Sequence, residues 1–392
     1  MTLYLRNFDA NLTSVYDAAL ASGELIFTAS ETVFSKETDL DVEGEICYAP
    51  ALNKKPLGVL PTVEASNPHP TQDSGLSNSV VVEVVKSNPF LPHSPGLYVT
   101  DASDDHKILL NKFCITPRHF LVVTKEFHQQ TEPLSPEDML AVWNTLAAVK
   151  NPENALAFYN CGAKSGASQP HKHLQVIPLE DRPAPIVNLV RQLSERKRGQ
   201  RGKLPGDIFS VPINCINHVI LLPDPSTYGT LSKGLEEVLT EAYIKLMDAM
   251  MFSIREYSEQ ETLSEEDRDL CFAIGSISAF AYNWILTREF MMIVPRKKDT
   301  ATLTNLSSQG ASEQGVAGIT VELPVNSLGF AGMILTRSEE ELELAKQQGV
   351  FNTVAQTGFT FNHEISPEAE ERRKKEQEAI EKQLGGAFTS SS

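Results

Sequence analysis

The sequence lacks the features that mark several protein classes. Its 392 residues contain no Cys-x-x-Cys pair, and the five cysteines stand far apart. This disfavours both a paired-cysteine zinc site and a disulfide framework. No apolar run approaches the ~18 residues that suggest a membrane span, and the first residues do not have the pattern of a secretory signal. We therefore expect a cytoplasmic protein with reduced thiols, and leave entry into the nucleus open.

Basic residues are also scarce. The chain has 34 lysines and arginines against 51 acidic residues, which gives a formal net charge of -17. A field of this sign repels nucleic acid backbones and anionic membranes, so neither is expected as a partner. If the substrate is itself an anion, its site has to be a local patch of positive charge in a negative protein.

The remaining pattern is that of a folded α+β protein. With 41% hydrophobic residues the chain can form a sizeable core. Strands come in runs with helices beside them and without regular β-α-β alternation, which predicts a mostly antiparallel sheet. The expected helices cover 8–22, 135–149, 183–197, 232–258, 338–348 and 368–383. The expected strands cover 25–28, 45–50, 79–86, 108–113, 120–125, 155–159, 174–179 and 217–222, two more lie within 272–296, and 301–318 is expected to be a loop.

One stretch, residues 160 to 178, stands out chemically. A loop of small residues, 162–169, leads into Pro170, His171 and His173, and an apolar run follows. If His171 begins a strand, alternation places His171, His173 and Gln175 on one face. The glycines of the loop allow several backbone N–H groups to point at one anion. A histidine beside such a loop suggests phosphoryl or nucleotidyl transfer.

Two other interpretations of the paired histidines remain open at this point. His-x-His is also a common spacing for zinc ligands, although a closed zinc site needs four ligands and this chain has no cysteine pair. The two imidazoles can also be buried on a strand without any chemical role. The flanking loop favours chemistry over both.

The stretch from Gly166 to Gln175, Gly-Ala-Ser-Gln-Pro-His-Lys-His-Leu-Gln, resembles the active-site signature of the histidine-triad superfamily in its transferase form. In that form the third histidine is replaced by glutamine, as Gln175 is here. The resemblance is strongest to the fungal diadenosine tetraphosphate phosphorylases, also called ATP adenylyltransferases. It extends to 110–113, 117–125, 283–287, 293–296 and 325–332, and together the matches cover most of residues 40 to 345.

The resemblance implies a fold and an activity. The fold is a mostly antiparallel sheet of the histidine-triad and galactose-1-phosphate uridylyltransferase type with flanking helices. Its expected parts are a catalytic part at 1–203, a part at 204–365 that completes the sheet and the pocket, and a charged helix with a tail at 366–392. The activity is phosphorolysis of diadenosine tetraphosphate, with phosphate, to ADP and ATP through an adenylyl-histidine. A divalent cation, magnesium, is expected to bind with the substrate, with no tightly bound cofactor, and a monomer is expected.

The resemblance also assigns residues. His173 is the expected nucleophile, and His171 is expected to orient it or to bond nearby backbone. Gln175 is expected to donate a hydrogen bond without the acid–base capacity of a third histidine. Further expected substrate-binding residues are Lys54, Asn111, Asn160, Gly166, Ala167, Ser168, Gln169, Thr287, Met292 and Arg296. No residue is expected to be a dedicated metal ligand.

Two other functions remain open from the sequence. A uridylyltransferase of the galactose-1-phosphate type shares the pattern that Ser168 to Gln175 fits, although the flanking segments match less well. The other is a catalytically inactive dinucleotide-binding regulator. It would bind dinucleotides without turnover, and the intact His171, His173 and Gln175 argue against it.

Overall fold

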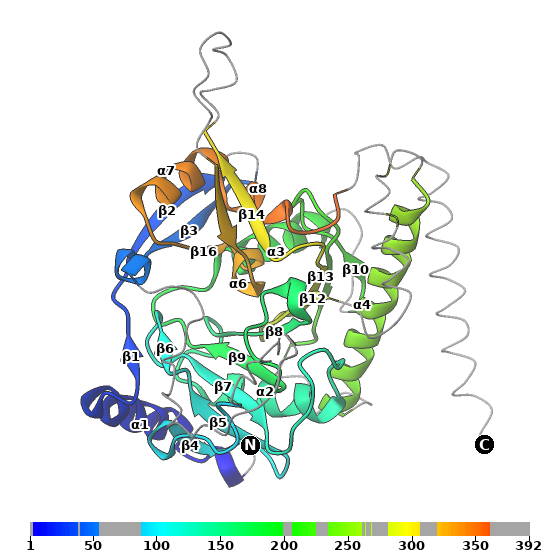
Figure 1. The fold of residues 1–392 in the computed structure, drawn as a ribbon. Coiled ribbons are helices and arrows are strands. Elements are labelled where there is room, and N and C mark those ends of the chain that lie inside the picture. Colours follow the sequence, from blue (N-terminus) through cyan, green and yellow to red (C-terminus); the bar gives the residue numbers. More distant parts are fainter. Residues whose placement is uncertain are drawn as a thin grey trace, which may run out of the picture.

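The computed structural model describes residues 3–37, 40–54, 88–198, 206–224, 234–260, 263, 268, 281–305 and 320–360 (Figure 1). The strand expected at 79–86 and the helix expected at 368–383 lie outside these ranges. No helix among the described residues is long and apolar enough to cross a membrane.

A nine-stranded sheet forms the centre of the molecule, and every neighbouring pair in it is antiparallel. In spatial order it contains β10 (Ile208–Phe209), β11 (His218–Leu221), β13 (Phe290–Pro295), β12 (Tyr282–Leu286), β8 (Leu156–Cys161), β9 (His173–Ile177), β7 (Phe120–Thr124), β5 (His106–Leu110) and β4 (Tyr98–Asp101). The mostly antiparallel α+β fold is thus confirmed. Strands from both sides of position 203 join through the β12–β8 pair, so the C-terminal part completes the sheet.

Smaller sheets lie against this one. The first contains β2 (Glu31–Glu37), β3 (Val42–Tyr48) and β16 (Met333–Thr336), where the β3–β16 pair is parallel. The second is the hairpin of β14 (Thr300–Thr304) and β15 (Thr320–Pro324), and the third pairs β1 (Ile26–Phe27) with β6 (Phe113–Cys114). In Figure 1 the β2–β3–β16 sheet lies above the central sheet.

Four of these strands differ from the sequence-based expectation. The ranges of β2, β15 and β16 were not expected to form strands, and β14 occupies the start of the loop expected at 301–318. Polar composition made β14 look like a loop. Ala301 and Leu303 alternate with threonines and are fully buried, and threonine is β-branched and suits a half-buried strand.

Helices cover both faces of the central sheet. On one face lie α1 (Phe8–Ser22), α2 (Pro136–Ala148) and α4 (Leu235–Ser258), whose buried side chains share one apolar cluster with Leu174, Val176 and Trp284 of the sheet. On the other face lie α3 (Pro185–Arg198), α6 (Ser327–Phe330), α7 (Glu339–Gln348) and α8 (Val350–Ala355), in a second cluster with the sheet residues Phe158 and Ile177. The long α4 runs along one side of the molecule (Figure 1).

The N-terminus of α2 contains a buried charge network. Ser135 caps the helix and forms a reciprocal capping box with Asp138, as its sequence predicts. The Asp138 carboxylate also lies 2.7 Å from Lys172 Nζ and 2.8 Å from His106 Nε2, and all three side chains are at most 5% exposed. Burial alone would raise the pKa of Asp138, but the bonds from His106, Lys172 and the Ser135 backbone hold it at about 2. The ion pair between Asp138 and Lys172 connects α2 to the segment between His171 and His173.

Asp138→Asn should lower the free energy of unfolding at pH 7 by about 3 kcal/mol, because it leaves the Lys172 ammonium buried without its counter-charge. The folded-state pKa of Asp138 lies below its ordinary value of 3.8. The stabilisation is therefore present above pH 4 and is lost as the pH falls through 2, so the difference between the two proteins should shrink over that range. Urea unfolding at pH 7, 5 and 3 measures it. The exposed neighbour Glu137→Gln is the control, and an equal difference at all three pH values would contradict the assignment.

Candidate active site

The loop between β8 and β9 is shaped by two glycines. Gly162 has φ 80° and Gly166 has φ 83°, a region that favours glycine. A Cβ atom at Gly166 would lie 2.8 Å from the Val325 carbonyl oxygen and 3.0 Å from Asn326 Cβ. Glycine at this position therefore lets the loop lie directly against the segment that leads into α6.

His173 begins β9 and is 4% exposed. Its Nδ1 lies 2.8 Å from the carbonyl oxygen of His171. Because a carbonyl can only accept, Nδ1 carries the proton and Nε2 carries the lone pair. Burial lowers the pKa of His173 to about 4, against the opposing effect of that hydrogen bond. The ring is thus a neutral imidazole with one defined nucleophilic nitrogen.

His171 is fully buried and precedes the strand rather than beginning it, since it forms only an isolated bridge with Gln129. Its Nε2 lies 3.0 and 3.1 Å from the carbonyl oxygens of Thr124 and Glu126, and its Nδ1 lies 2.9 Å from Asn88 Nδ2. Burial lowers its pKa. Both ring nitrogens are engaged by the protein, which agrees with the expected orienting role and leaves neither for the substrate.

Gln175 lies on the face of β9 opposite Leu174 and Val176, which pack into the apolar core behind the sheet. It lines a cavity of about 550 Å³ together with Asn111, His119 and Phe158. The C-terminal part closes this cavity with the residues Val325, Asn326, Leu328, Gly329, Met333, Ile334, Leu335 and Arg337. Gln175 and Asn111, which are far apart in the sequence, thus line the same cavity, and residues of the C-terminal part line it as well.

His119 is a lining residue to which the sequence analysis assigned no role. Its Nδ1 lies 3.1 Å from Asn111 Nδ2, while its Nε2 is buried and forms no hydrogen bond of good geometry among the described residues. Burial lowers its pKa to about 4, and a looser side-chain hydrogen bond with the neighbouring Gln175 opposes the shift. With Nδ1 accepting from Asn111, Nε2 is a donor that a bound ligand can use. The sequence contained one indication of this position. The strands on either side of Pro117 pair with each other, and this pairing brings Asn111 and His119 opposite one another.

Asn160 and Arg296 are placed in a buried network beside the loop rather than in the cavity lining. Asn160 Oδ1 accepts from Asn283 Nδ2 at 2.9 Å and from the Ser327 hydroxyl at 2.7 Å. The Arg296 guanidinium is 1% exposed and donates to Asn283 and to the carbonyl oxygens of Ser165, Lys298, Val325 and Thr357. Burial lowers its pKa to about 9. The network fixes the loop against the C-terminal part, and it engages both Asn160 and the Arg296 guanidinium, which were expected to bind substrate.

Thr287 and Met292 are not brought to the cavity. The Thr287 hydroxyl closes the turn between β12 and β13, where it accepts from the backbone N–H groups of Glu289 and Phe290. Met292 is fully buried in the apolar cluster on that face of the sheet. Both residues belong to the β12–β13 hairpin. The Thr287 hydroxyl stabilises its turn, and the Met292 side chain packs in the core.

The remaining expected substrate-binding residues lie at the end of the glycine loop and in a short helix after β3. Ala167 and Gln169 are half-buried and Ser168 is exposed, so the loop end is accessible to a ligand. Lys54 ends the short helix η2 (Pro50–Lys54), and its side chain lies outside the described part of the chain. The other short helices are η1 (Leu3–Leu5), η3 (Pro95–Leu97) and η4 (Ala163–Ser165).

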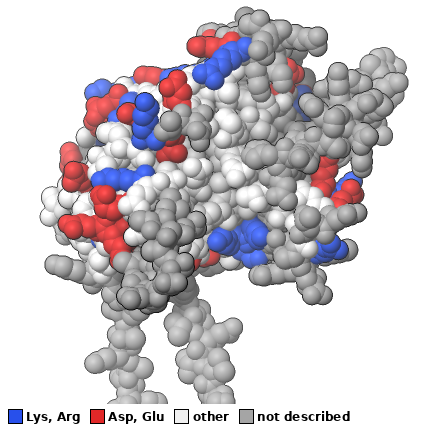
Figure 2. All heavy atoms as spheres, turned by 90° about the horizontal axis from the view of Figure 1, so that it is seen from above, with Lys and Arg blue, Asp and Glu red and all other residues white. Residues whose placement is uncertain are grey.

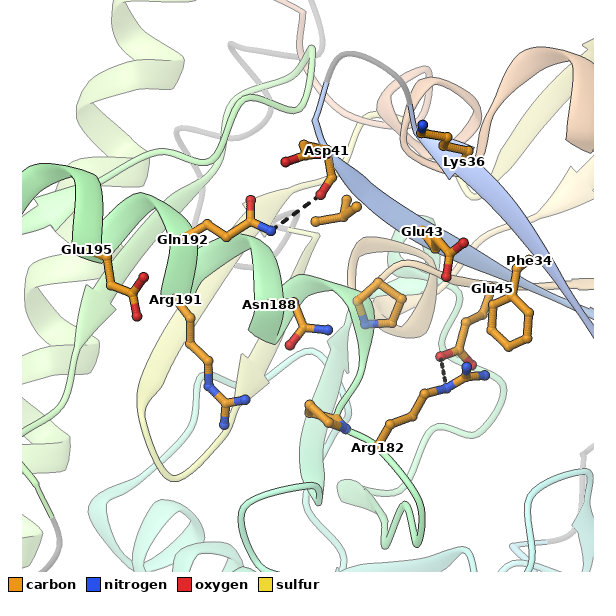
Figure 3. Close-up of a pocket in the computed structure, with 13 residues that line it drawn as sticks. Phe34, Lys36, Asp41, Glu43, Glu45, Arg182, Asn188, Arg191, Gln192 and Glu195 are labelled. Carbon is orange, nitrogen blue, oxygen red and sulfur yellow. Dashed lines mark hydrogen bonds and ion pairs between the residues drawn. The ribbon is translucent and has the colours of Figure 1, made fainter.

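Charge around the cavity differs from the expected positive patch. Its described lining contains two arginines, Arg182 and Arg337, against the three carboxylates Glu45, Glu180 and Asp181. Arg182 bonds Glu45 at 3.1 Å and lies over the Phe34 ring, and this pair also borders a neighbouring groove along α3 (Figure 3). On the face seen in Figure 2, basic and acidic side chains are interspersed. Neutral donors rather than an excess of cations face the cavity in the described structure.

Comparison with known proteins decides the family. Residues 67–192 match the family model of the Ap4A phosphorylase N-terminal domain, and residues 210–360 match that of the ATP adenylyltransferase C-terminal domain. The chain belongs to the Ap4A phosphorylase family. As a member of it, the protein is a nucleotidyltransferase.

Individual relatives agree with this family. Diadenosine 5',5'''-P1,P4-tetraphosphate phosphorylase 2 of Saccharomyces cerevisiae is 24% identical over 347 residues, which cover 86% of this chain and 89% of the relative. The structure of yeast Ap4A phosphorylase Apa2 in complex with AMP superposes with a TM-score of 0.66 at 24% identity, covering 93% of this chain and all of that one. The complex of the same enzyme with Ap4A gives a TM-score of 0.63 at 22% identity, covering 91% of this chain and 99% of that one. These structures share the fold.

The position of Thr287 generates a test. Thr287→Val should lower the free energy of unfolding by about 1 to 2 kcal/mol, because two backbone N–H groups lose their acceptor. It should leave the affinity for AMP within about twofold, because the hydroxyl faces its own turn. Asn111→Ala in the cavity should instead weaken AMP binding about tenfold, the loss expected for a hydrogen bond or two. Calorimetric titration with AMP and urea unfolding of both variants measure the two effects. A weakened AMP affinity in Thr287→Val would indicate that Thr287 belongs to the binding site.

Proposed function

We propose that the protein catalyses the reversible phosphorolysis of diadenosine tetraphosphate, which with phosphate gives ADP and ATP. The observation that carries this proposal is the neutral His173 imidazole with its proton held on Nδ1. It lies two residues before Gln175 on the same face of β9, and Gln175 lines a cavity of about 550 Å³ that is large enough for a nucleoside. Histidine in this state is a competent nucleophile toward phosphorus.

In the first step, Nε2 of His173 attacks the α-phosphorus of the dinucleotide. A P–N bond forms, the P–O bond to the next phosphate breaks, and ATP leaves with that bonding pair. The ring acquires positive charge as it is adenylylated. The His171 carbonyl, 2.8 Å from Nδ1, faces that charge and stabilises it. In the second step phosphate attacks the same phosphorus, the P–N bond breaks, and ADP leaves with His173 neutral again.

Gln175 and His119 supply neutral donors to the phosphoryl oxygens. An amide donates without transferring a proton, so Gln175 does not help water to attack the intermediate. The His119 Nε2–H is a second donor on the same wall of the cavity. Backbone N–H groups of Ala167 to Gln169 complete the set, as anion sites of this kind need, whereas the Gly166 N–H donates to the Ala163 carbonyl at 3.3 Å. Such fixed dipoles stabilise the charge that develops during transfer.

The ligands follow from the same chemistry. Dinucleoside polyphosphates, ATP, ADP and phosphate are the proposed small-molecule partners, and solved relatives with AMP and Ap4A support nucleotide binding by this fold. A divalent cation is proposed to arrive with the polyphosphate. Among the described residues no group of three or more His, Cys, Asp and Glu side chains could hold a metal ion. The monomeric state, the cytoplasmic location and the boundary at 203 stay predictions.

Product analysis tests the activity. With diadenosine tetraphosphate, magnesium and phosphate, the protein should give equal ADP and ATP, and His173→Ala should lose at least about 1,000-fold of this rate, as nucleophile removal generally does. Gln175→His should raise the share of AMP, because a third imidazole can help water to attack. Chromatography of the nucleotides, with and without phosphate, measures both. AMP and ATP from the unmodified protein without phosphate would indicate a hydrolase, and turnover only with UDP-glucose and galactose-1-phosphate a uridylyltransferase. Dinucleotide binding without any turnover would indicate the regulator.

The buried nucleophile predicts a shifted pH profile. Because the pKa of His173 is lowered to about 4, its neutral, reactive form persists as the pH falls and is lost only through that value. We expect kcat/KM to stay within about twofold between pH 7.5 and 5.5, whereas a histidine of ordinary pKa would be only about a tenth neutral at pH 5.5. The measurement is the pH dependence of kcat/KM at saturating phosphate. An acid limb centred near pH 6.5 would contradict the burial of the free imidazole.

A further inference from the structure

Strands β8 and β9 separate immediately before the nucleophile. Their last pair is Phe158 with Gln175, and in the same register the pairs that would follow are Tyr159 with Leu174 and then Asn160 with His173. The Gln130 side chain occupies that place. Its Oε1 accepts from the His173 backbone N–H at 2.8 Å, and its Nε2 donates to the carbonyl oxygens of Asn160 at 2.9 Å and His173 at 3.2 Å. A side-chain amide thus replaces one step of the backbone ladder.

The backbone of Gln130 holds the two ends of the loop. Its N–H donates to the Pro170 carbonyl at 2.8 Å, and its carbonyl accepts from the Gly162 N–H at 3.3 Å and from the Tyr159 hydroxyl at 2.9 Å. Gln130 is 3% exposed, and every polar atom of its side chain and backbone has a partner. One residue from the segment between β7 and α2 therefore fixes where the glycine loop leaves β8 and where it returns to β9.

This arrangement has a geometric consequence. Paired strands lie about 4.8 Å apart, which leaves no room for an inserted amide, so Gln130 keeps β8 and β9 apart at this level. The amide can be oriented in only one way, because its oxygen faces an N–H and its nitrogen faces two carbonyls. The backbone N–H and carbonyl of His173 are both satisfied by it, and the ring is fixed in turn by the His171 carbonyl. The direction in which the His173 Nε2 points is therefore fixed by hydrogen bonds to the backbone of His171 and His173.

We propose that Gln130 is a positioning residue of the transfer reaction, which holds the His173 peptide and both ends of the glycine loop in the geometry for in-line attack. It rests on the proposed function. Gln130 is not among the residues that line the described cavity, so its effect falls on the alignment of the bound phosphorus with Nε2. Since a misplacement of about 1 Å costs on the order of 100-fold in rate, kcat should respond strongly while KM changes little.

The first test is kinetic. Gln130→Met keeps the length of the side chain and removes all three amide bonds. We expect kcat to fall about 100-fold with KM within about threefold. The matched control is Gln129→Met, since the Gln129 side chain is exposed and only accepts from the Thr131 hydroxyl, and it should leave both constants unchanged. An unchanged kcat in Gln130→Met, or a change confined to KM, would overturn the proposal.

A second variant separates positioning from general destabilisation. Gln130→Glu keeps an acceptor for the His173 N–H but places a carboxylate oxygen against two carbonyls. Protonation restores the missing donor, so kcat of this variant should recover at least about tenfold between pH 7.5 and 5.5, while the unmodified enzyme stays nearly flat. A merely structural role predicts a uniformly low rate over this range. A uniformly low rate would also overturn the proposal. This test can be carried out even if Gln130→Met does not fold.

A spectroscopic measurement does not depend on the activity. In the ligand-free protein labelled with 15N-histidine, and assigned with His173→Gln, the His173 ring should show one Nδ1–H tautomer. Gln130→Met should show exchange between tautomers, and Gln129→Met should not. If the unmodified protein has no turnover of diadenosine tetraphosphate, the proposed function fails, while these spectra still decide whether Gln130 orients His173. Identical spectra in all three proteins would refute that orientation.

Discussion

The hydrogen bond from His173 Nδ1 to the His171 carbonyl is the constraint on which the site depends. A buried imidazole without a partner on Nδ1 could carry its proton on either nitrogen, and only one of these tautomers leaves Nε2 able to attack. The carbonyl is available because His171 precedes the strand and forms only an isolated bridge instead of entering the ladder. Its own ring is then fixed by the Thr124 and Glu126 carbonyls and by Asn88. His171 thus contacts the His173 ring through its backbone carbonyl, while both nitrogens of its own ring are engaged by the protein.

The two parts of the chain are joined at this point by buried polar groups. Asn160 comes from β8, Asn283 from β12, and Ser327 and Arg296 from the C-terminal part, and their side chains meet around the Ser165 carbonyl. A guanidinium 1% exposed among carbonyl oxygens is stable only if all of its donors are used. The network therefore fixes one arrangement of the loop against α6, and the close approach at Gly166 follows from it.

Charge is distributed differently from what a polyanionic substrate suggests. The described cavity wall is neutral or mildly acidic, with Arg182 partly neutralised by Glu45. The neutral polar side chains that face it include the amides of Asn111 and Gln175 and the imidazole of His119. Fixed dipoles of this kind stabilise a developing charge without the reorganisation that mobile charged side chains require. A negative protein can thus bind a polyphosphate through local dipoles.

Local sequence was enough to predict the α+β class, the helices expected at 8–22, 135–149 and 232–258, and the common face of His173 and Gln175, because caps and alternation act over a few residues. The motif also identified the family, which the two family models confirm. Only the tertiary structure decided the rest. Arg296 and Thr287 look like substrate residues in sequence, yet their partners lie in a turn or in carbonyls up to 131 residues away. Gln130 shows no local pattern, because its partners lie in β8, in β9 and at both ends of the glycine loop, whereas His119 is brought opposite Asn111 by the pairing of β5 with β7. Long-range packing decides which side chains face the cavity, and no short-range periodicity contains that information.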